Sequence, residues 1–314
     1  MKNLIIGGKG YVGSRLTQEL DGIIDTVDLE IYPTVKNKIT NLLTDYNLLS
    51  VDFLKDYDNI ILLAGHSSVR MCDAPPHCSF NNNVRNFVSL LSKLNDNQTL
   101  IYASSASVYG DCKHTIVDES YNFDKPYNMY DLSKQMIDTY YILLKSNTRI
   151  FGLRFGTVNG YSPVLREDIM INSMVASAWK NNKIMLFNSD VRRSILGMSD
   201  LVNAIQTILR SNKSHGGIYN LSSFTHKAKE IADKVSFLLD CPIETLVTGK
   251  IDQTINEKLI SSKYNFALSC NKFCNDFNFS FKEDVDSIVH SLVKNKNNMI
   301  FTNRNIAYNY ENII

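Results

Sequence analysis

The 314-residue sequence predicts an α/β fold: a Rossmann-type doubly wound parallel sheet with a smaller C-terminal substrate-binding lobe. Two observations predict it. Short apolar runs alternate with helix-like segments throughout the first half of the chain, and a glycine pattern follows the first apolar run directly. Alternating strand and helix units place helices on both faces of a parallel sheet. In such folds, ligands bind at the carboxyl ends of the strands.

The first half contains five strand-like runs, at residues 3–6, 23–27, 59–63, 99–103 and 149–153. The segments between them with a helical pattern of apolar residues are 11–20, 44–54, 83–94 and 127–145. The last of these is the strongest. It carries one apolar stripe, made of Met129, Leu132, Met136, Tyr140 and Leu143. Apolar residues repeating at this spacing indicate a helix.

The alternation of strand-like and helix-like segments becomes less regular beyond residue 160. We expect helices at 169–179, 200–209, 225–239 and 285–293, strands at 193–198 and 217–221, and a polar-aromatic tail at 299–314. Ser199 is a candidate N-cap for the helix that follows it. These segments predict a Rossmann-type domain over residues 1–160, with strand and helix returns around 193–240. Residues 161–314 would then form mainly a substrate-binding lobe.

Composition narrows the class of protein. The 33 basic and 32 acidic side chains give a net charge of +1, which does not favour binding to nucleic acid or to an anionic membrane. No run of about 18 apolar residues predicts a membrane span. The N-terminus lacks a signal-peptide pattern, so we expect a cytoplasmic protein. None of the six cysteines forms a C-x-x-C pair, and no metal site is expected.

The glycine loop predicts a dinucleotide site. Gly7, Gly10 and Gly13 follow a strand and open a helix. Glycine permits the tight turn and a close approach of the backbone to a pyrophosphate, which the helix N-terminus attracts. Asp28 ends the second strand, 15 residues past Gly13. A carboxylate there accepts hydrogen bonds from ribose hydroxyls and repels a 2′-phosphate, so NAD is favoured over NADP.

Two further motifs carry a family resemblance. Residues 104–110 read SSASVYG, and Tyr130-Asp131-Leu132-Ser133-Lys134 follows them. Together with the glycine loop, they resemble the extended short-chain dehydrogenases/reductases, in particular the nucleotide-sugar epimerase/dehydratase branch. The resemblance covers residues 1–240. Supporting segments are Leu63-Ala64-Gly65-His66, Asn82-Asn83-Val84, Leu153-Arg154, Arg193 to Asp200, and Tyr219-Asn220-Leu221.

The resemblance implies that Ser105, Tyr130 and Lys134 are catalytic. A tyrosine with an unperturbed pKa of about 10 is a poor base at neutral pH. Lys134 lies one helical turn from Tyr130, and its ammonium together with the nicotinamide would lower the phenol pKa. Ser105 would orient the reacting oxygen. The implied cofactor contacts are Gly7, Gly10, Tyr11, Val12, Gly13, Asp28, Leu63, Ala64, Gly65, Asn82, Tyr130, Lys134 and Phe155.

The residues beside Ser105 narrow the choice of reaction. In the dehydratases, decarboxylases and fucose synthases that the chain resembles, positions 106 and 107 carry an acid or a cysteine base; here they are Ala106 and Ser107. Neither can transfer the extra proton unaided. We therefore expect a nucleotide-sugar epimerase, acting at C4 through a transient keto sugar. A keto-sugar reductase or dehydrogenase, dependent on NAD or NADP, needs the same residues and is the alternative. A non-enzymatic NAD sensor is a third reading, less favoured because Tyr130 and Lys134 are present.

The resemblance also implies substrate contacts at Ser105, Ser107, Thr157, Arg166, Asn172 and Arg193. Arg193 precedes Asp200 by seven residues and would bind the substrate diphosphate, which a guanidinium suits. Two positions depart from the family pattern: Thr157 replaces an asparagine, and Gly197 replaces a histidine. The helices at 83–94 and 127–145 form a dimer interface in relatives, so a homodimer is expected.

Overall fold

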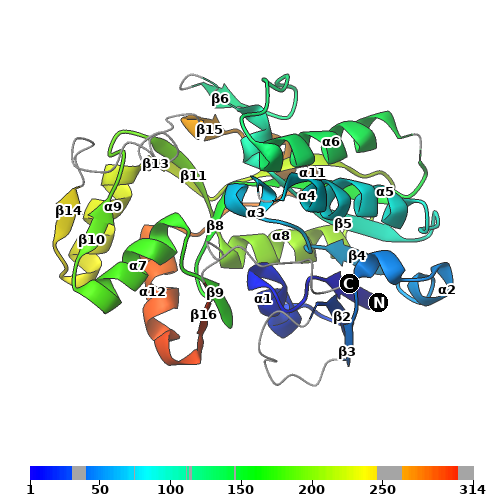
Figure 1. Cartoon of the computed structure of the whole chain (residues 1–314), viewed down its shortest axis with the longest axis horizontal. Coiled ribbons are helices and arrows are strands. Elements are labelled where there is room, and N and C mark those ends of the chain that lie inside the picture. The colour runs from blue at the N-terminus through cyan, green and yellow to red at the C-terminus, as the bar shows by residue number, and fades with distance from the viewer. Residues whose placement is uncertain are drawn as a thin grey trace.

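A computed structural model of the chain describes residues 1–29, 40–73, 75–110, 112, 115–144, 146–245 and 264–302. Its centre is a parallel sheet of seven strands in the order β12-β7-β5-β4-β1-β2-β3 (Figure 1). The strands are β1 (Lys2–Ile6), β2 (Ile23–Asp28), β3 (Thr40–Leu43), β4 (Asn59–Leu62), β5 (Thr99–Ser105), β7 (Arg149–Phe155) and β12 (Gly217–Leu221). Every strand pair in this sheet is parallel. The predicted Rossmann-type architecture is thereby confirmed.

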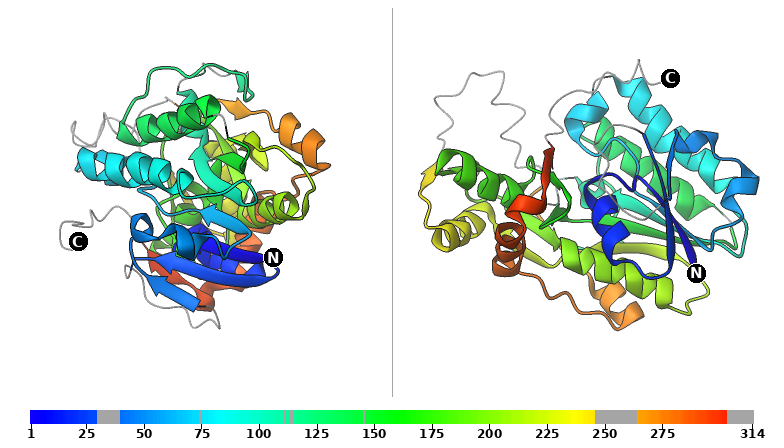
Figure 2. Two further views of the ribbon diagram at one scale, coloured as in Figure 1. Left: turned by 90° about the vertical axis from the view of Figure 1, so that its right-hand side faces the viewer. Right: turned by 90° about the horizontal axis from the view of Figure 1, so that it is seen from below.

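Both faces of the sheet are covered by helices. The elements are α1 (Tyr11–Glu19), η1 (Tyr46–Leu48), α2 (Val51–Leu54), α3 (Val69–Asp73), α4 (Pro76–Phe80), η2 (Asn81–Arg85), α5 (Asn86–Leu91), η3 (Ala106–Tyr109), α6 (Met129–Leu143), α8 (Met198–Arg210) and α11 (Asn271–Phe277). In Figure 2, α5 and α6 lie on one side of the sheet and α1 and α8 on the other.

Alternate residues of the strands supply the two halves of the core. In β5, Leu100 and Tyr102 pack with Phe87 of α5, while Ile101 points to the opposite face and packs with Leu201 of α8. A strand buried on both faces reads as a continuous apolar run, which is why these strands could be located from the sequence.

A smaller lobe follows the sheet. It contains β8 (Thr157–Asn159), β9 (Val164–Arg166), α7 (Met170–Asn181), β10 (Ile184–Leu186), β11 (Arg192–Gly197), β13 (Phe224–Lys227), α9 (Ala228–Leu239), β14 (Ile243–Thr245), α12 (Val285–Lys294), η5 (Lys296–Asn298) and β16 (Ile300–Thr302). A short pair, β6 (Ile116–Val117) with β15 (Ala267–Leu268), lies above β11 in Figure 1. The helices α7, α9 and α12 share one apolar core.

The glycine-loop helix joins this lobe to the sheet. The Tyr11 hydroxyl donates to the Gly160 carbonyl at 2.7 Å and accepts from Asn172 at 3.1 Å, and Ser14 lies 2.8 Å from Ser162. The strand β12 returns from beyond the lobe to the edge of the main sheet. The division of ligand binding between residues 1–160 and 161–314 stays a prediction.

Three local predictions are wrong. Residues 44–54 form two short helices, η1 and α2, instead of one long helix, because Asp45 and Ser50 each cap a new helix start. The first residues of the expected helix 225–239 belong to β13, which pairs antiparallel with β11. Gly197 is the N-cap of α8 and Ser199 lies inside the helix, since the Glu283 carboxylate already accepts from the Asp200 N–H at 3.0 Å.

The Gly197 departure has a structural explanation. A Cβ built on Gly197 would lie 2.1 Å from the Glu283 carboxylate. The space next to position 197 is therefore occupied by Glu283, which comes from the segment before α12.

The expected tail at 299–314 lies mostly outside the described residues, as does Lys145 at the end of the helix predicted at 127–145. Among the described residues, no helix has the length and apolarity that crossing a membrane requires.

Candidate active site

The glycine loop is shaped to hold a dinucleotide phosphate. Gly7 has a φ of +93°, and a Cβ there would lie 2.6 Å from the Ala64 nitrogen. A Cβ on Gly13 would lie 2.1 Å from the Gly7 carbonyl oxygen. Helix α1 begins after Gly10, which offers no side chain as a cap, so its first N–H groups face the loop. Such a helix N-terminus binds anions.

Asp28 stands beside this loop at the end of β2. Its carboxylate accepts from the backbone N–H of Lys9 at 2.7 Å and of Leu29 at 2.8 Å, which fixes its orientation. Asp28 lines a small cavity with Ala64 and Asn82. The Asn82 Oδ1 is buried and has no hydrogen-bond partner within the described residues. A buried acceptor of this kind is costly unless a ligand satisfies it, so the residues present fit the adenosine half of NAD.

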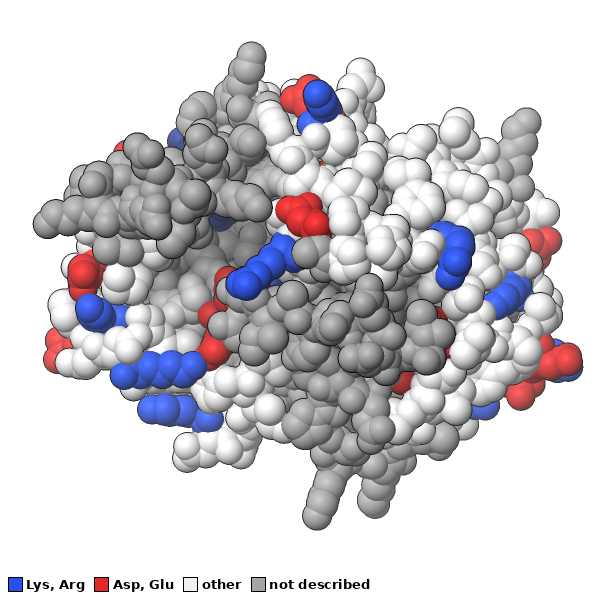
Figure 3. Space-filling view, in the orientation of Figure 1, with Lys and Arg blue, Asp and Glu red and all other residues white. Residues whose placement is uncertain are grey.

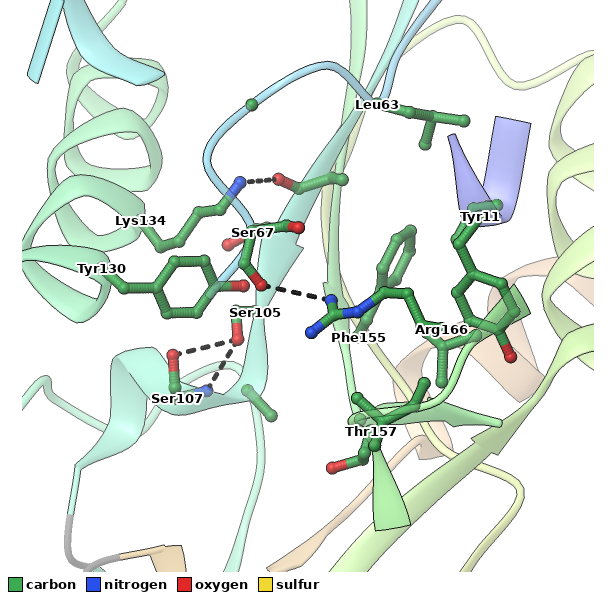
Figure 4. Close-up of a pocket in the computed structure, with 18 of the residues that line it drawn as sticks. Tyr11, Leu63, Ser67, Ser105, Ser107, Tyr130, Lys134, Phe155, Thr157 and Arg166 are labelled. Atoms are coloured by element: carbon green, nitrogen blue, oxygen red, sulfur yellow. Dashed lines mark hydrogen bonds between the residues drawn. The ribbon is translucent and has the colours of Figure 1, made fainter. Parts of the chain in front are cut away.

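A larger cavity of about 320 Å³ continues from the same loop, and the two share Gly7, Gly10, Leu63 and Gly65. It lies at the carboxyl ends of β1, β4, β5 and β7, on the edge where the lobe begins (Figure 4). Its volume is in the usual range for small-molecule sites. The predicted cofactor residues that line it are Tyr11, Val12, Gly13, Phe155, Tyr130 and Lys134 in addition to the four shared positions.

Helix α6 brings Tyr130 and Lys134 to this cavity. The helix starts where the Asn128 side chain accepts from the Asp131 N–H at 2.9 Å, so Tyr130 and Lys134 fall on its pocket side one turn apart. The Lys134 Nζ donates to the Ala103 carbonyl at 2.7 Å and lies 5.9 Å from the centre of the Tyr130 ring. Figure 4 shows both side chains pointing into the pocket.

The local environment shifts the pKa values of both Tyr130 and Lys134. Burial raises the pKa of the Tyr130 phenol, while the interaction with Ser105 and the nearby Arg166 charge oppose that rise. Burial lowers the pKa of Lys134 to about 8, against the opposing effects of Cys72 and Asp138. A perturbed base and cation that share one pocket are typical of a functional site.

Ser105 ends β5 and faces Tyr130. Its Oγ donates to the Ser107 Oγ at 2.9 Å and accepts from the Ser107 N–H at 3.2 Å. Ser107 and Ala106 also line the cavity, so the positions next to Ser105 are occupied by a hydroxyl and a methyl group. The buried Ser104 Oγ, also at the cavity, has no partner within the described residues.

The lobe contributes two arginines with different partners. Arg166 is held by Asp168 through two hydrogen bonds of 3.0 and 2.6 Å and donates to the Ser67 carbonyl at 3.3 Å. Arg193 donates to the carbonyls of Tyr264 and Arg192 at 2.8 and 3.1 Å and makes no ion pair within the described part of the chain. Burial lowers the pKa of Arg193. Both arginines line the cavity.

Among the predicted substrate residues, Ser105, Ser107, Thr157, Arg166 and Arg193 line the cavity, whereas Asn172 does not. Asn172 is fully buried: its Oδ1 accepts from Gly160 N–H at 2.9 Å, and its Nδ2 donates to Tyr11 and to the Arg166 carbonyl. The structure therefore gives Asn172 a supporting position behind the pocket, because all its polar atoms already have protein partners.

Several pocket residues carried no signal in the sequence. Tyr264 and Phe266 reach the cavity from a segment about 130 residues beyond Tyr130, and Ser67 and Ile169 come from positions outside any motif. His66, the last residue of the Leu63–His66 motif, is buried and its Nδ1 lies 2.6 Å from the Ser79 Oγ, so it fixes the loop after β4.

A glycine loop at a sheet's switch point, with a serine, a tyrosine and a lysine at the neighbouring strand ends, defines a dinucleotide-dependent oxidoreductase fold of the extended short-chain dehydrogenase/reductase class. Residues 3–222 match the NAD dependent epimerase/dehydratase family, and the chain belongs to it. It is therefore a member of a family of NAD-dependent enzymes.

Similar proteins are found by sequence and by fold. Protein CapI of Staphylococcus aureus is 29% identical over 240 residues, which are 68% of this chain and 71% of CapI. UDP-glucuronate 4-epimerase 1 of Arabidopsis thaliana is 26% identical over 244 residues, 68% of this chain and 56% of that protein.

Solved structures share the fold at lower identity. UDP-glucose-4-epimerase from Stenotrophomonas maltophila, with bound NAD and formylated UDP-arabinopyranose, has a TM-score of 0.81 at 16% identity, covering 94% of this chain and 97% of that one. MoeE5 in complex with UDP-glucuronic acid and NAD has a TM-score of 0.78 at 18% identity, covering 95% and 99%.

Proposed function

We propose that the protein is an NAD-dependent nucleotide-sugar epimerase that inverts C4 through a transient keto sugar. The observation that carries the proposal is the placement of the Tyr130 phenol, Ser105 and Lys134 on one cavity that continues into the glycine loop. Bound NAD supplies a hydride acceptor and donor. The other parts of the chemistry fall to side chains of the chain.

Tyr130 would accept the proton of the sugar hydroxyl as hydride leaves the same carbon. Ser105 would hold that oxygen, and Lys134 would stabilise the phenolate with its positive charge. Return of the hydride to the opposite face of that carbon, together with return of the proton from Tyr130 to its oxygen, would complete the inversion without any net change in the enzyme. Nothing in this sequence of steps needs an acid at position 106 or 107, which agrees with Ala106 and Ser107 there.

The substrate diphosphate would bind Arg193. This guanidinium lines the cavity, has no carboxylate partner within the described residues, and is partly buried, so a phosphate would satisfy it. Ser107, Thr157 and Arg166 would contact the sugar. The names of relatives favour UDP-linked sugars as the first substrates to test, since they include 4-epimerases of UDP-glucose and UDP-glucuronate.

A homodimer through α5 and α6 is part of the proposal. The C-terminal part of the apolar stripe of α6 is exposed: Tyr140 is 40% exposed and Leu143 74%, while the polar Asp131 and Asp138 are buried. Phe80 of α4 is exposed as well. A second copy would cover this apolar face. Light scattering should give twice the chain mass, and Leu143→Glu should give monomer. A cytoplasmic location and a role in carbohydrate biosynthesis stay predictions.

The experiment that tests the proposal is a screen of the NAD-loaded protein with UDP-, GDP-, CDP- and dTDP-sugars. We expect one nucleotide sugar to raise the melting temperature and to be converted to its C4 epimer with no accumulation of NADH. Net consumption of NADH with a 4-keto sugar would instead assign the chain to the reductases. No conversion or reduction of any nucleotide sugar by stably folded, NAD-loaded protein would contradict the proposal.

A further inference from the structure

Tyr264 contacts the helix that carries Tyr130. Its hydroxyl donates to the Asp131 Oδ2 at 2.6 Å and accepts from the Asn128 Nδ2 at 2.8 Å. The Asn128 Nδ2 also donates to the Asp131 Oδ2 at 2.9 Å, so the three side chains form a closed triangle. Asn128 caps α6, and Asn128 and Asp131 flank Tyr130 in the first turn of that helix. The Tyr264 hydroxyl is therefore bound to the turn from which Tyr130 enters the cavity (Figure 4).

The same segment is bound to the smaller lobe through β11. The Tyr264 carbonyl accepts from the Arg193 guanidinium at 2.8 Å. The side chain of the next residue, Asn265, accepts from the Arg192 backbone N–H at 2.9 Å. Two consecutive residues of the segment thus bond to two consecutive residues of β11.

Tyr264 connects these two attachments along the wall of the cavity. It lines the cavity together with Arg193 and Tyr130, which come from different parts of the fold. One hydrogen bond reaches Arg193 from the Tyr264 backbone, and the others reach α6 from its side chain. Asp131 is fully buried, so removing a donor from its carboxyl group would be costly for the first turn of α6.

We propose that Tyr264 is a positioning residue that holds Tyr130 at a fixed place relative to Arg193. Its hydroxyl fixes the first turn of α6, and its carbonyl orients the guanidinium that would bind the substrate diphosphate. A sugar attached to that diphosphate would then meet the Tyr130 phenol in a geometry that allows proton transfer. The inference rests on the proposed function for the roles of Tyr130 and Arg193. Tyr264 would not itself accept the substrate proton, because its hydroxyl already donates to a carboxylate.

The first test is Tyr264→Phe, which removes the hydroxyl and keeps both the ring and the carbonyl. We expect hydride transfer from a nucleotide sugar to bound NAD to slow by about 10- to 100-fold, the effect of a small misplacement of a reacting group. KM and the affinity for NAD should stay at their wild-type values, since Arg193 keeps its carbonyl partner. A rise in KM with unchanged kcat would overturn the proposal, because the hydroxyl would then contact the substrate instead of holding α6.

Tyr57→Phe is the matched control. The Tyr57 hydroxyl donates to the Asp25 Oδ2 at 2.9 Å, and neither residue lines either cavity. The variant therefore loses a tyrosine–aspartate hydrogen bond of the same kind away from the site. It should keep the wild-type rate of hydride transfer. A slowing equal to that of Tyr264→Phe would overturn the proposal, because a general loss of stability would then account for both.

Asn128→Ser tests the same contact from α6. A serine keeps an oxygen that can cap the helix but lacks the amide that donates to Tyr264. It should also lower kcat at unchanged KM, and the slowing in the double variant with Tyr264→Phe should fall below the product of the single effects. Single effects that multiply would overturn the proposal. If Tyr264→Phe does not fold, Asn128→Ser decides alone, and an unchanged rate in it would contradict the proposal.

Amide hydrogen exchange separates this inference from the proposed function. If the wild type converts no nucleotide sugar, the proposed function fails, and the contact between Tyr264 and α6 is tested without substrate. At the start of α6, the Asp131 and Leu132 N–H groups donate to Asn128. In NAD-loaded Tyr264→Phe their exchange should be faster by about 2- to 10-fold, the factor that the loss of one ordinary hydrogen bond gives, and in Tyr57→Phe it should be unchanged. Wild-type exchange in Tyr264→Phe would overturn the positioning role.

Discussion

The cofactor side and the substrate side of the cavity are built in different ways. On the cofactor side, the loop after β1, the end of β2 and the loop after β4 supply backbone N–H groups and one carboxylate, and their main partners lie within a few dozen residues. On the substrate side, Arg166, Arg193 and Tyr264 come from separate segments. Arg166 donates to the Ser67 carbonyl, 99 residues away, and Arg193 donates to the Tyr264 carbonyl, 71 residues away. The cofactor side is set by local geometry, and the substrate side by tertiary packing.

On the face shown in Figure 3, the described lysines and arginines are interspersed with acidic side chains and form no single-sign stripe among the described residues. The proposal therefore assigns recognition of an anionic substrate to individual cations inside the cavity. The following variants are ordered from the largest expected effect to the smallest.

Tyr130 lies where the two sides meet, so its loss should have the largest effect. We expect Tyr130→Phe to slow hydride transfer by about 10²- to 10⁴-fold, because the proton acceptor is gone while the ring still packs. NAD affinity should change little. Rapid-mixing absorbance of the bound cofactor checks this, with Tyr140→Phe on the exposed side of the same helix as the control. Unchanged hydride transfer in Tyr130→Phe would remove the catalytic assignment.

Arg193 tests the substrate side alone. Arg193→Met should raise KM for the nucleotide sugar by a factor matching about 1.5–3 kcal/mol, the usual worth of a hydrogen bond to a charged group. Affinity for NAD should be unchanged. Steady-state kinetics give KM for the nucleotide sugar, and a cofactor titration gives the affinity for NAD. A loss of NAD affinity equal to the loss of substrate affinity would show that the two sides are not independent.

Gly13 tests the cofactor side alone. The Cβ of Gly13→Ala would meet the Gly7 carbonyl at 2.1 Å, so the loop must move. Overpacking of this kind costs about 1–3 kcal/mol. We expect that loss in NAD affinity, measured by titration, together with a lower melting temperature. A variant that binds NAD as tightly as the wild type would contradict the close packing of the loop.

Lys134 links both sides through its charge. Tyr130 must be ionised to accept a proton, so the rate rises with pH as the phenol ionises. Removing the ammonium in Lys134→Met removes a charge that favours the phenolate, and the acid limb should move up by about 1 pH unit. The pH profile at saturating NAD checks this. A limb that stays in place would mean that Lys134 acts only as a cofactor contact.

Asp28 has the smallest expected effect. Asp28→Asn keeps an acceptor but loses the charge, which should cost about 0.5–1.5 kcal/mol of NAD affinity. Binding of NADP should become measurably less unfavourable, since the repulsion of its 2′-phosphate falls. Parallel titrations with NAD and NADP give the ratio of the two affinities. An unchanged ratio would place the 2′-hydroxyl away from Asp28.

The sequence predicted most elements of the cofactor side, because six of the seven strands of the central sheet are short apolar runs and the loop after β1 carries its own glycines, whereas β3 was not predicted. All the residues predicted to contact NAD line one of the two cavities. On the substrate side, Asn172 was expected in the cavity but lies behind it, and Tyr264 was not expected at all. Their positions depend on packing between distant segments, which no local pattern records.

Helix α6 shows most clearly which features a sequence pattern cannot predict. Its apolar stripe indicated the helix, yet the structure buries Asp131, Ser133 and Asp138 and exposes Leu143. Asp138 pairs with Arg154 at 2.8 Å beneath the sheet, and both side chains are buried. Such a pair is stable only because each charge finds its partner, and a partner sixteen residues away on another element leaves no periodic signal.

The most direct test of the central claim uses a nucleotide sugar that carries deuterium at C4. The NAD-loaded protein should convert it to the C4 epimer with the deuterium still at C4, because the same hydride returns to the same carbon, and Tyr130→Phe should not. An epimer that has lost its deuterium, or a keto sugar that accumulates together with reduced cofactor, would contradict the account.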